Sequence, residues 1–422
     1  MRTDNETARE AGGGSGGDQL LKLGFIPLVD CAPLVVAAEK GFAAAEGLHL
    51  ELVRETSWAN IRDRVMLGHF DGAHMLGPLP IATTLGIGGH VEVPMVAPFS
   101  LGLGGNAVTV SEPLFSEMQS AGVRLGDGPA DMAKAIGAVV AARDSRADPV
   151  VTIAMVHPFS GHNYELRYWL ASAGIDPDHD VRLVVLPPPF MVDALKEGQV
   201  DAFCVGEPWN SLAVDEGVGV IVATKSALWR QGPEKVLGLR ARFAEDHPDR
   251  LHRLVRALYR AAAWAGDPAN RDDLADLLAQ PAYVGAPATI IRRALGGELH
   301  LRSGEPPAAV PDFLVFHDHA ANFPWQSHAL WFYSQMVRWG QIGHDRATAD
   351  RARLVYRPDL YRAALKTTNA DLPSASAKVE GALLAQEPVA SRNGRMVLGP
   401  DGFFDGLLFD PDDIEGYLRK LR

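Results

Sequence analysis

Five residues scattered along the chain offer hydrogen-bond donors of five different kinds. They are Trp58, Asn106, His162, Gly206 and Lys235. They supply an indole N–H, an amide NH₂, an imidazole, a backbone N–H and an ammonium, and Glu207 is the only carboxylate expected close to them. A donor-rich set of this kind suits a small, weakly basic oxyanion whose oxygens accept several hydrogen bonds at once. Taken alone, each of these residues more often has a structural role than a functional one. Glu207 is about equally suited to contact a ligand or to cap a nearby helix.

Two similar stretches predict the elements that position these donors. Residues 198–210 read GQVDAFCVGEPWN, and residues 68–80 read GHFDGAHMLGPLP. Each stretch predicts a short apolar strand that stops at a glycine followed closely by a proline. Open α/β sheets bind ligands at the carboxyl ends of their strands. Two such strand ends favour two α/β lobes that face each other across a central cleft.

The order of the remaining elements agrees with this architecture. Apolar runs at Leu21–Leu28 and His49–Arg54 predict strands separated by a helix, so parallel pairing is expected in the first lobe. From Thr224 onwards the pattern is mostly helical. We expect a flexible leader at residues 1–20, a first lobe formed by residues 21–105 and 225–422 with a C-terminal helical extension, and a second lobe at residues 106–224.

Composition and motifs exclude several classes of protein. The chain has 422 residues and a net charge of −12, without a visible basic stripe, which argues against direct binding of nucleic acid. No run of 18 apolar residues predicts a membrane span, and residues 1–20 lack a secretory signal, which predicts a cytoplasmic protein. Catalytic motifs are not apparent, so no enzyme and no cofactor are expected. His317 and His319 could bind a metal, but closely spaced histidines are usually structural, and we predict no metal site.

Several stretches resemble the nitrate- and bicarbonate-binding proteins of ABC uptake systems. They read GFIPLVDCAPLVVAAEKGF, ETSWANIRDRV, DGAHMLGPLP, VGEPWN, GPEKVLG, FHDHAANFPWQSHALWFYSQMVRWG and YRPDLYRAAL. They follow one another from Leu21 to near the C-terminus. The resemblance implies the type II periplasmic-binding-protein clamshell, with two α/β lobes that close on the ligand.

The resemblance also implies a ligand. The family's pocket tryptophan, histidine, glycine and lysine match Trp58, His162, Gly206 and Lys235, while Asn106 stands where the family has a glutamine. Members that bind bicarbonate with calcium carry an acidic residue at the position of Lys235. A lysine there repels Ca²⁺ and neutralises a monovalent anion directly. The implied ligand is therefore nitrate or nitrite, without calcium.

Two roles are compatible with this resemblance. The missing export signal favours the cytoplasmic sensor branch of the family, whose ligand-free form holds an RNA-binding antiterminator protein and releases it when nitrate or nitrite binds. The alternative is the substrate-binding component of a nitrate ABC transporter, which works with a permease and an ATPase and is periplasmic if the true start differs. An enzyme of the same fold would need a nucleophile or an acid–base pair in the cleft, and none is apparent.

Overall fold

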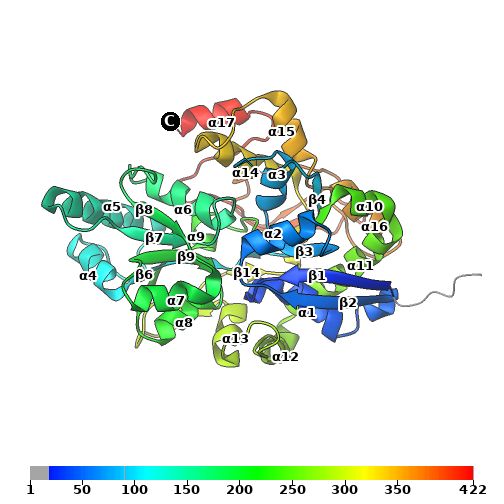
Figure 1. The fold of residues 1–422 in the computed structure, drawn as a ribbon, viewed down its shortest axis with the longest axis horizontal. Helices are drawn as coiled ribbons and strands as arrows, with labels where there is room; N and C mark the ends of the chain where they lie inside the picture. The colour runs from blue at the N-terminus through cyan, green and yellow to red at the C-terminus, as the bar shows by residue number, and fades with distance from the viewer. Residues whose placement is uncertain (1–18, 90, 422) are drawn as a thin grey trace, which may run out of the picture.

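The computed structural model describes residues 19–89 and 91–421, and it contains two separate five-stranded sheets that lie side by side (Figure 1). Helices cover both sheets. Within these residues, no helix combines the length and the apolar character needed to cross a membrane. Most of the predicted leader lies outside the described residues, but the first strand already begins at Gln19.

The first sheet has the strand order β2-β1-β3-β11-β4. Its strands are β1 (Gln19–Phe25), β2 (Leu48–Arg54), β3 (Gly72–Leu76), β4 (Met95–Ser100) and β11 (Lys235–Arg240). β1 pairs in parallel with β2 and β3, as predicted, whereas β11 runs antiparallel to β3 and β4. The helices associated with this sheet are α1 (Ala32–Glu39), α2 (Trp58–Met66), α3 (Leu79–Thr84), α10 (Ala241–Asp246), α11 (Pro248–Gly266) and α16 (Pro358–Leu365). β3 is buried along its whole length, as expected for a strand that is covered on both faces.

The second sheet has the order β10-β6-β9-β7-β8. Its strands are β6 (Asn106–Ser111), β7 (Thr152–Met155), β8 (Arg182–Val185), β9 (Ala202–Gly206) and β10 (Gly219–Thr224). β7 runs parallel to β8 and β9, while β6 runs antiparallel to β9 and β10. Its helices are α4 (Glu112–Ser120), α5 (Pro129–Arg146), α6 (Gly161–Ala171), α7 (Met191–Lys196), α8 (Trp209–Asp215) and α9 (Lys225–Leu228).

Two segments carry the chain between the sheets before the C-terminal part begins. One runs from β4 to β6 through the short strand β5 (Leu103–Gly104), and Gly105 separates β5 from β6. A Cβ at Gly104 would lie 2.2 Å from the Phe313 carbonyl oxygen, and φ at Gly104 is +76°, so glycine is required there. The other segment runs from β10 through α9 to β11.

The C-terminal part returns to both sheets. β14 (Leu314–Val315) pairs with β5, and β12 (Glu298–Leu299) pairs with β13 (Ala308–Ala309). The remaining elements are α12 (Arg271–Leu278), α13 (Ala288–Gly296), α14 (Gln326–Arg338), α15 (Arg346–Arg353), α17 (Ile414–Lys420), β15 (Glu387–Pro388) and β16 (Val397–Leu398). Phe403 of the last segment stacks on Trp229, with ring centroids 4.6 Å apart. The C-terminal part therefore packs directly on the second crossing between the sheets.

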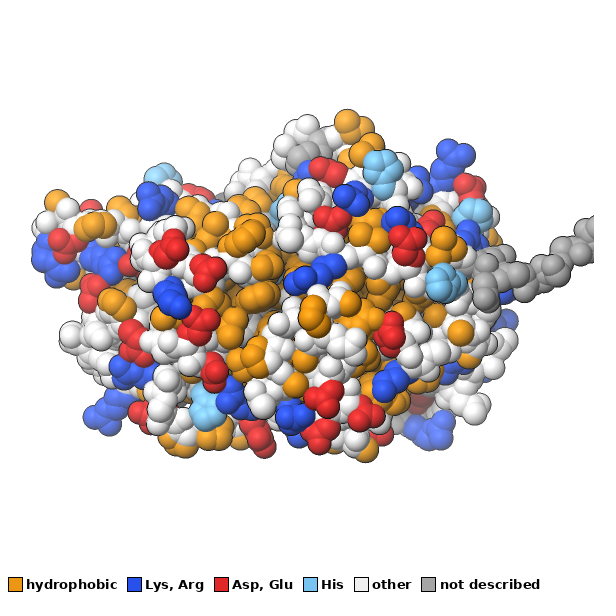
Figure 2. All heavy atoms as spheres, turned by 60° about the horizontal axis from the view of Figure 1, so that its bottom comes forward, with side chains coloured by type: hydrophobic (Ala, Val, Ile, Leu, Met, Phe, Trp, Pro, Cys, Tyr) orange, Lys and Arg blue, Asp and Glu red, His pale blue; other side chains and the backbone are white. Residues whose placement is uncertain are grey.

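Acidic and basic side chains are interspersed over the face shown in Figure 2, and they surround apolar side chains near its centre. No basic stripe crosses the described part of this face.

Candidate functional site

The structure brings the five predicted donors together between the two sheets. Trp58 begins α2, Asn106 begins β6, Gly206 ends β9 and Lys235 begins β11, while His162 is the second residue of α6. The four side chains are buried. The assembly follows from strand pairing, because Asn106 lies opposite Gly206 and Lys235 lies opposite Leu76. The carboxyl ends of β3 and β9, the two strand ends predicted from the sequence, thus lie beside the same group of donors.

A carboxylate that sequence analysis did not select lies at the centre of this group. Glu234 accepts hydrogen bonds from Asn106 Nδ2 at 2.7 Å, from Lys225 Nζ at 2.8 Å and from Lys235 Nζ at 2.7 Å. His162 Nδ1 lies 3.4 Å from Glu234 Oε1. The expectation that Glu207 is the only carboxylate near the donors is therefore wrong. Glu234 lies in irregular backbone immediately before β11. In a strand, successive side chains point to opposite faces, but this rule does not apply to Glu234, so its carboxylate can lie beside Lys235.

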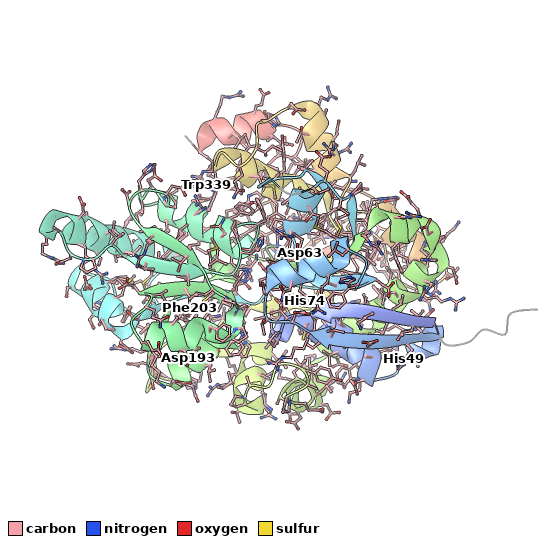
Figure 3. The ribbon with its side chains drawn as sticks, viewed as in Figure 1. His49, Asp63, His74, Asp193, Phe203 and Trp339 are labelled. Atoms are coloured by element: carbon pink, nitrogen blue, oxygen red, sulfur yellow. The ribbon has the colours of Figure 1, made fainter. Side chains whose placement is uncertain are left out.

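Asp30 and His74 extend the cluster on the side of the first sheet. Asp30, in a 3₁₀ turn at Val29–Cys31, accepts a hydrogen bond from Lys235 Nζ at 2.8 Å. Its other oxygen lies 2.9 Å from Nε2 of His74, which is on β3 (labelled in Figure 3). Burial raises the pKa of Asp30, but Lys235 and His74 outweigh burial and hold this pKa at about 2. Asp30 is therefore a buried anion at neutral pH.

Lys225 and Glu165 extend the cluster on the side of the second sheet. Lys225 Nζ donates to Glu165, to the Pro233 carbonyl at 2.7 Å and to Glu234. Burial lowers the pKa of Lys225, yet Glu165 and Glu234 raise it above its usual value. Burial raises the pKa of Glu165 to about 7 although Lys225 opposes this shift. Glu165 is consequently only partly ionised at neutral pH.

The resulting cluster is close to electrically neutral. Two ammonium groups face the carboxylates of Asp30 and Glu234 and the partly ionised Glu165. Burial lowers the pKa of His162 to about 3, so its imidazole is uncharged at pH 7. Burial likewise lowers the pKa of His74. The predicted donors are therefore present, but the positive charge of Lys235 is already compensated by protein carboxylates.

Four polar atoms of the predicted residues are buried without a hydrogen-bond partner among the described residues. They are Trp58 Nε1, Asn106 Oδ1 and both ring nitrogens of His162. Buried polar groups in proteins almost always have partners, so atoms of this kind mark a place built for a polar ligand or water. A Cβ at Gly206 would lie 3.4 Å from Asn106 Oδ1 and 3.6 Å from Asp30 Oδ2, so glycine keeps the space beside these atoms open.

Glu207 faces away from the cluster towards α8. Its carboxylate accepts a hydrogen bond from the backbone N–H of Ser211 at 3.2 Å. Burial raises its pKa to about 7. Of the two interpretations left open by the sequence, the geometry favours the cap of α8 over the ligand group.

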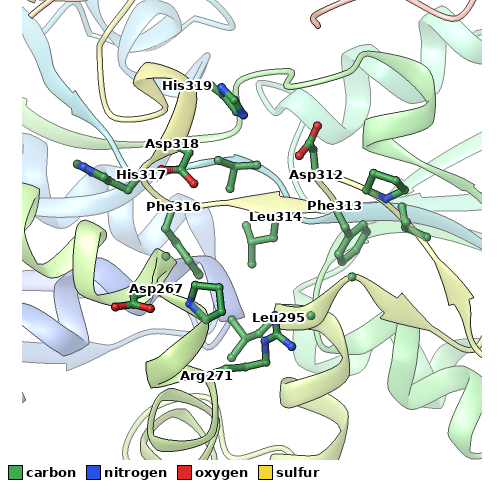
Figure 4. Close-up of a pocket in the computed structure, with 18 residues that line it drawn as sticks. Asp267, Arg271, Leu295, Asp312, Phe313, Leu314, Phe316, His317, Asp318 and His319 are labelled. Carbon is green, nitrogen blue, oxygen red and sulfur yellow. The ribbon is translucent and has the colours of Figure 1, made fainter. Parts of the chain in front are cut away.

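A separate cavity of about 230 Å³ lies beside β14, between the ends of α11 and α13 (Figure 4). His317 and His319 line it, but their rings point in different directions. His317 Nδ1 lies 3.0 Å from Asn322 Oδ1, and His319 Nδ1 lies 3.3 Å from the Val397 carbonyl oxygen. Among the described residues, no three His, Cys, Asp or Glu side chains are grouped so that they could hold a metal ion. None of the five predicted donors lines this cavity.

Comparison with known proteins finds relatives that match nearly the whole chain. A sequence profile described as the NMT1-like family matches residues 15–279. The nitrate import ATP-binding protein NrtC of Synechocystis is 39% identical over 98% of this chain, which spans only 57% of that protein. The nitrate/nitrite binding protein NrtA of Synechococcus elongatus is 34% identical, with 97% of this chain and 88% of that protein covered. The crystal structure of the periplasmic nitrate-binding protein NrtA from Synechocystis matches with a TM-score of 0.84 at 28% identity, covering 96% of this chain and 99% of that one.

The two five-stranded α/β parts have the periplasmic-binding-protein fold. The predicted fold class is thereby confirmed. The chain belongs to the NMT1-like family, together with the NrtA proteins. This kinship also confirms the prediction of a binding protein rather than an enzyme.

Proposed function

We propose that the chain binds nitrate or nitrite between its two sheets and serves as the substrate-binding component of an ABC import system. The observation that carries this proposal is the convergence of Trp58, Asn106, His162, Gly206 and Lys235, which come from both sheets, on one buried place. The similarity to NrtA over nearly the whole chain supports the same ligand class. A ligand contacted from both sheets favours the closed form, because closure supplies contacts that the open form lacks.

The chemistry of the donors favours a small anion over a cation. Lys235 Nζ lies 5.5 Å from the centre of the Trp58 ring, and Trp58 Nε1 and His162 Nε2 are among the buried nitrogens that have no hydrogen-bond partner within the described residues. An indole N–H can only donate, so it matches an oxygen acceptor. Two lysines within the cluster would repel Ca²⁺, which prefers an all-oxygen shell. The proposed ligand therefore binds without a metal.

Titration calorimetry on the purified full chain tests this proposal. Nitrate or nitrite should bind in the micromolar range, about 8 kcal/mol of binding free energy, with or without a calcium chelator. Chloride at the same ionic strength is the control. Bicarbonate binding that requires calcium, with no heat from nitrate or nitrite, would overturn the proposal.

The sensor role remains a separate prediction. The relatives named above are import proteins, so they support the transport role in preference to the sensor role. Pull-down with the tagged chain from a nitrate-free lysate distinguishes the two. An RNA-binding partner that elutes with millimolar nitrate, but not with chloride, would favour the sensor. Association with a permease and an ATPase would favour import.

A further inference from the structure

Glu234 occupies the position of an oxyanion among the donors. Its carboxylate is planar, carries one negative charge and accepts hydrogen bonds from three side chains. Two of these donors, Asn106 and Lys225, come from elements of the second sheet, whereas Lys235 begins β11 of the first. A protein-borne anion is thus held by groups from both sheets, next to the nitrogens that have no partner.

The charges already present in the cluster limit the charge of the ligand that can be buried beside them. The two ammonium groups of the cluster already pair with Asp30, Glu165 and Glu234. A further buried negative charge is costly unless a positive charge accompanies it. A dianion would add twice the charge at the same place. The site therefore needs one neutral group that becomes positive when an anion enters.

His162 is placed to be that group. Its ring is fully buried, Nδ1 lies 3.4 Å from Glu234 Oε1, and neither ring nitrogen has a hydrogen-bond partner among the described residues. A neutral imidazole donates one hydrogen bond, whereas an imidazolium donates two. Protonated His162 would give Nδ1–H to Glu234 and Nε2–H to the anion.

The other charged groups around His162 come from several elements. They are Glu165 on the same helix, Asp30 in the turn before α1, Lys225 on α9, and Glu234 and Lys235 at the start of β11. The two lysines oppose protonation of the ring, and the carboxylates favour it. An anion bound at Nε2 adds one more favourable charge at hydrogen-bond distance, which shifts the balance towards the imidazolium.

We infer that Glu234 sets the charge selectivity of the site: a monovalent anion enters together with one proton, taken from solvent by His162, and divalent anions are excluded. This inference rests on the proposed function and specifies the class of anion that the site accepts. Its consequence is that affinity rises as pH falls, because the proton is bound in the complex and not in the free protein.

The wild-type protein alone tests the proton uptake. Nitrate titrations at pH 7 in buffers of different ionisation enthalpy should show uptake of about one proton per anion, and the Kd should weaken about tenfold per pH unit between pH 6.5 and 8. Sulfate should not compete at millimolar concentration. Nitrate binding without proton uptake, or with sulfate as an equal competitor, would overturn this inference while leaving the proposed function intact. Absence of any nitrate or nitrite binding would overturn both.

Two variants locate the effect. In Glu234→Gln, proton uptake should fall towards zero and sulfate should bind at least tenfold more tightly than to wild type. Glu380→Gln is the matched control, since Glu380 is also buried beside a lysine and a histidine, and it should keep the wild-type uptake and selectivity. Unchanged uptake in a folded Glu234→Gln, or lost uptake in a folded Glu380→Gln, would contradict the assignment.

Discussion

At the scale of single residues, Glu234 and Lys235 are neighbours in sequence and direct partners in space, with Nζ 2.7 Å from Oε1. The ammonium also pairs with Asp30, so Lys235 is held by two carboxylates as well as facing the proposed ligand. Lys235 therefore contributes to both stability and binding, and the two contributions need separate measurements.

Lys235→Glu should abolish nitrate binding. The new carboxylate would stand beside Asp30 and Glu234, and reversing one partner of a buried ion pair costs roughly 3–5 kcal/mol, a loss of about 100-fold or more in affinity. Calorimetry measures the affinity, and circular dichroism verifies folding. Lys378→Ala removes a partly buried lysine, which pairs with Glu380 and Asp401, and should leave the affinity unchanged. A folded Lys235→Glu with affinity within threefold of wild type would place the lysine outside the binding site.

The pairing of Asp30 predicts an acid-dependent loss of stability. Its pKa is lowered from 3.8 to about 2, so its contribution is present above pH 4 and is lost as pH falls towards 2. The shift corresponds to about 2 kcal/mol. Urea unfolding of Asp30→Asn should show a lower free energy of unfolding at pH 7, and a weaker decrease between pH 4 and pH 2, than wild type. Asp193→Asn changes an exposed carboxylate and should keep the wild-type slope. Parallel pH curves for Asp30→Asn and wild type would contradict the prediction.

At the scale of elements, the start of α6 fixes the position of the central carboxylate. Ser160 caps this helix by accepting a hydrogen bond from the Asn163 N–H at 3.0 Å, so the first turn is held rigidly. Gly161 follows, and a Cβ there would lie 2.6 Å from Glu234 Oε2. The absence of a side chain lets the helix end approach Glu234 closely.

Gly161→Ala should displace Glu234 and weaken nitrate binding by roughly tenfold or more, because a 1 Å misplacement of a binding group is costly. Gly137→Ala is the matched control. Gly137 lies within α5, its added Cβ would meet atoms no closer than 3.7 Å, and alanine should stabilise that helix by up to about 1 kcal/mol. Calorimetry and thermal unfolding of both variants give the comparison. Equal affinities for Gly161→Ala and Gly137→Ala would show that Glu234 tolerates displacement.

At the scale of the whole molecule, the sequence predicted the two lobes better than the contents of the site. The glycine with a closely following proline at the ends of β3 and β9 is a local pattern, and both strand ends lie beside the cluster between the sheets. Asp30, Lys225 and Glu234 were missed because their importance comes from contacts across the molecule. Lys235 Nζ and Asp30 Oδ2, for example, are 205 positions apart in sequence and 2.8 Å apart in space. Only Glu234, next to Lys235, offered a local indication.

The proposed domain boundaries remain a prediction, since strand pairing alone does not define which residues move together. The strands of the second sheet run from Asn106 to Thr224, and those of the first sheet lie on either side of this range. The cluster at the interface combines residues from both parts, so its charge balance depends on how the sheets are placed.

The stacking of Trp229 on Phe403 has an optical consequence. Trp229 lies between Lys225 and Glu234 in the sequence, on the segment that joins β10 to β11, and its ring also lies 4.7 Å from that of Trp331. Indole emission is sensitive to neighbouring rings and to their orientation. A rotation of one sheet against the other is expected to move this segment and so to change the geometry of the aromatic stack. Trp229 is thus an intrinsic fluorophore on the segment that joins β10 to β11. Its emission offers a starting point for a label-free fluorescent assay of anion binding.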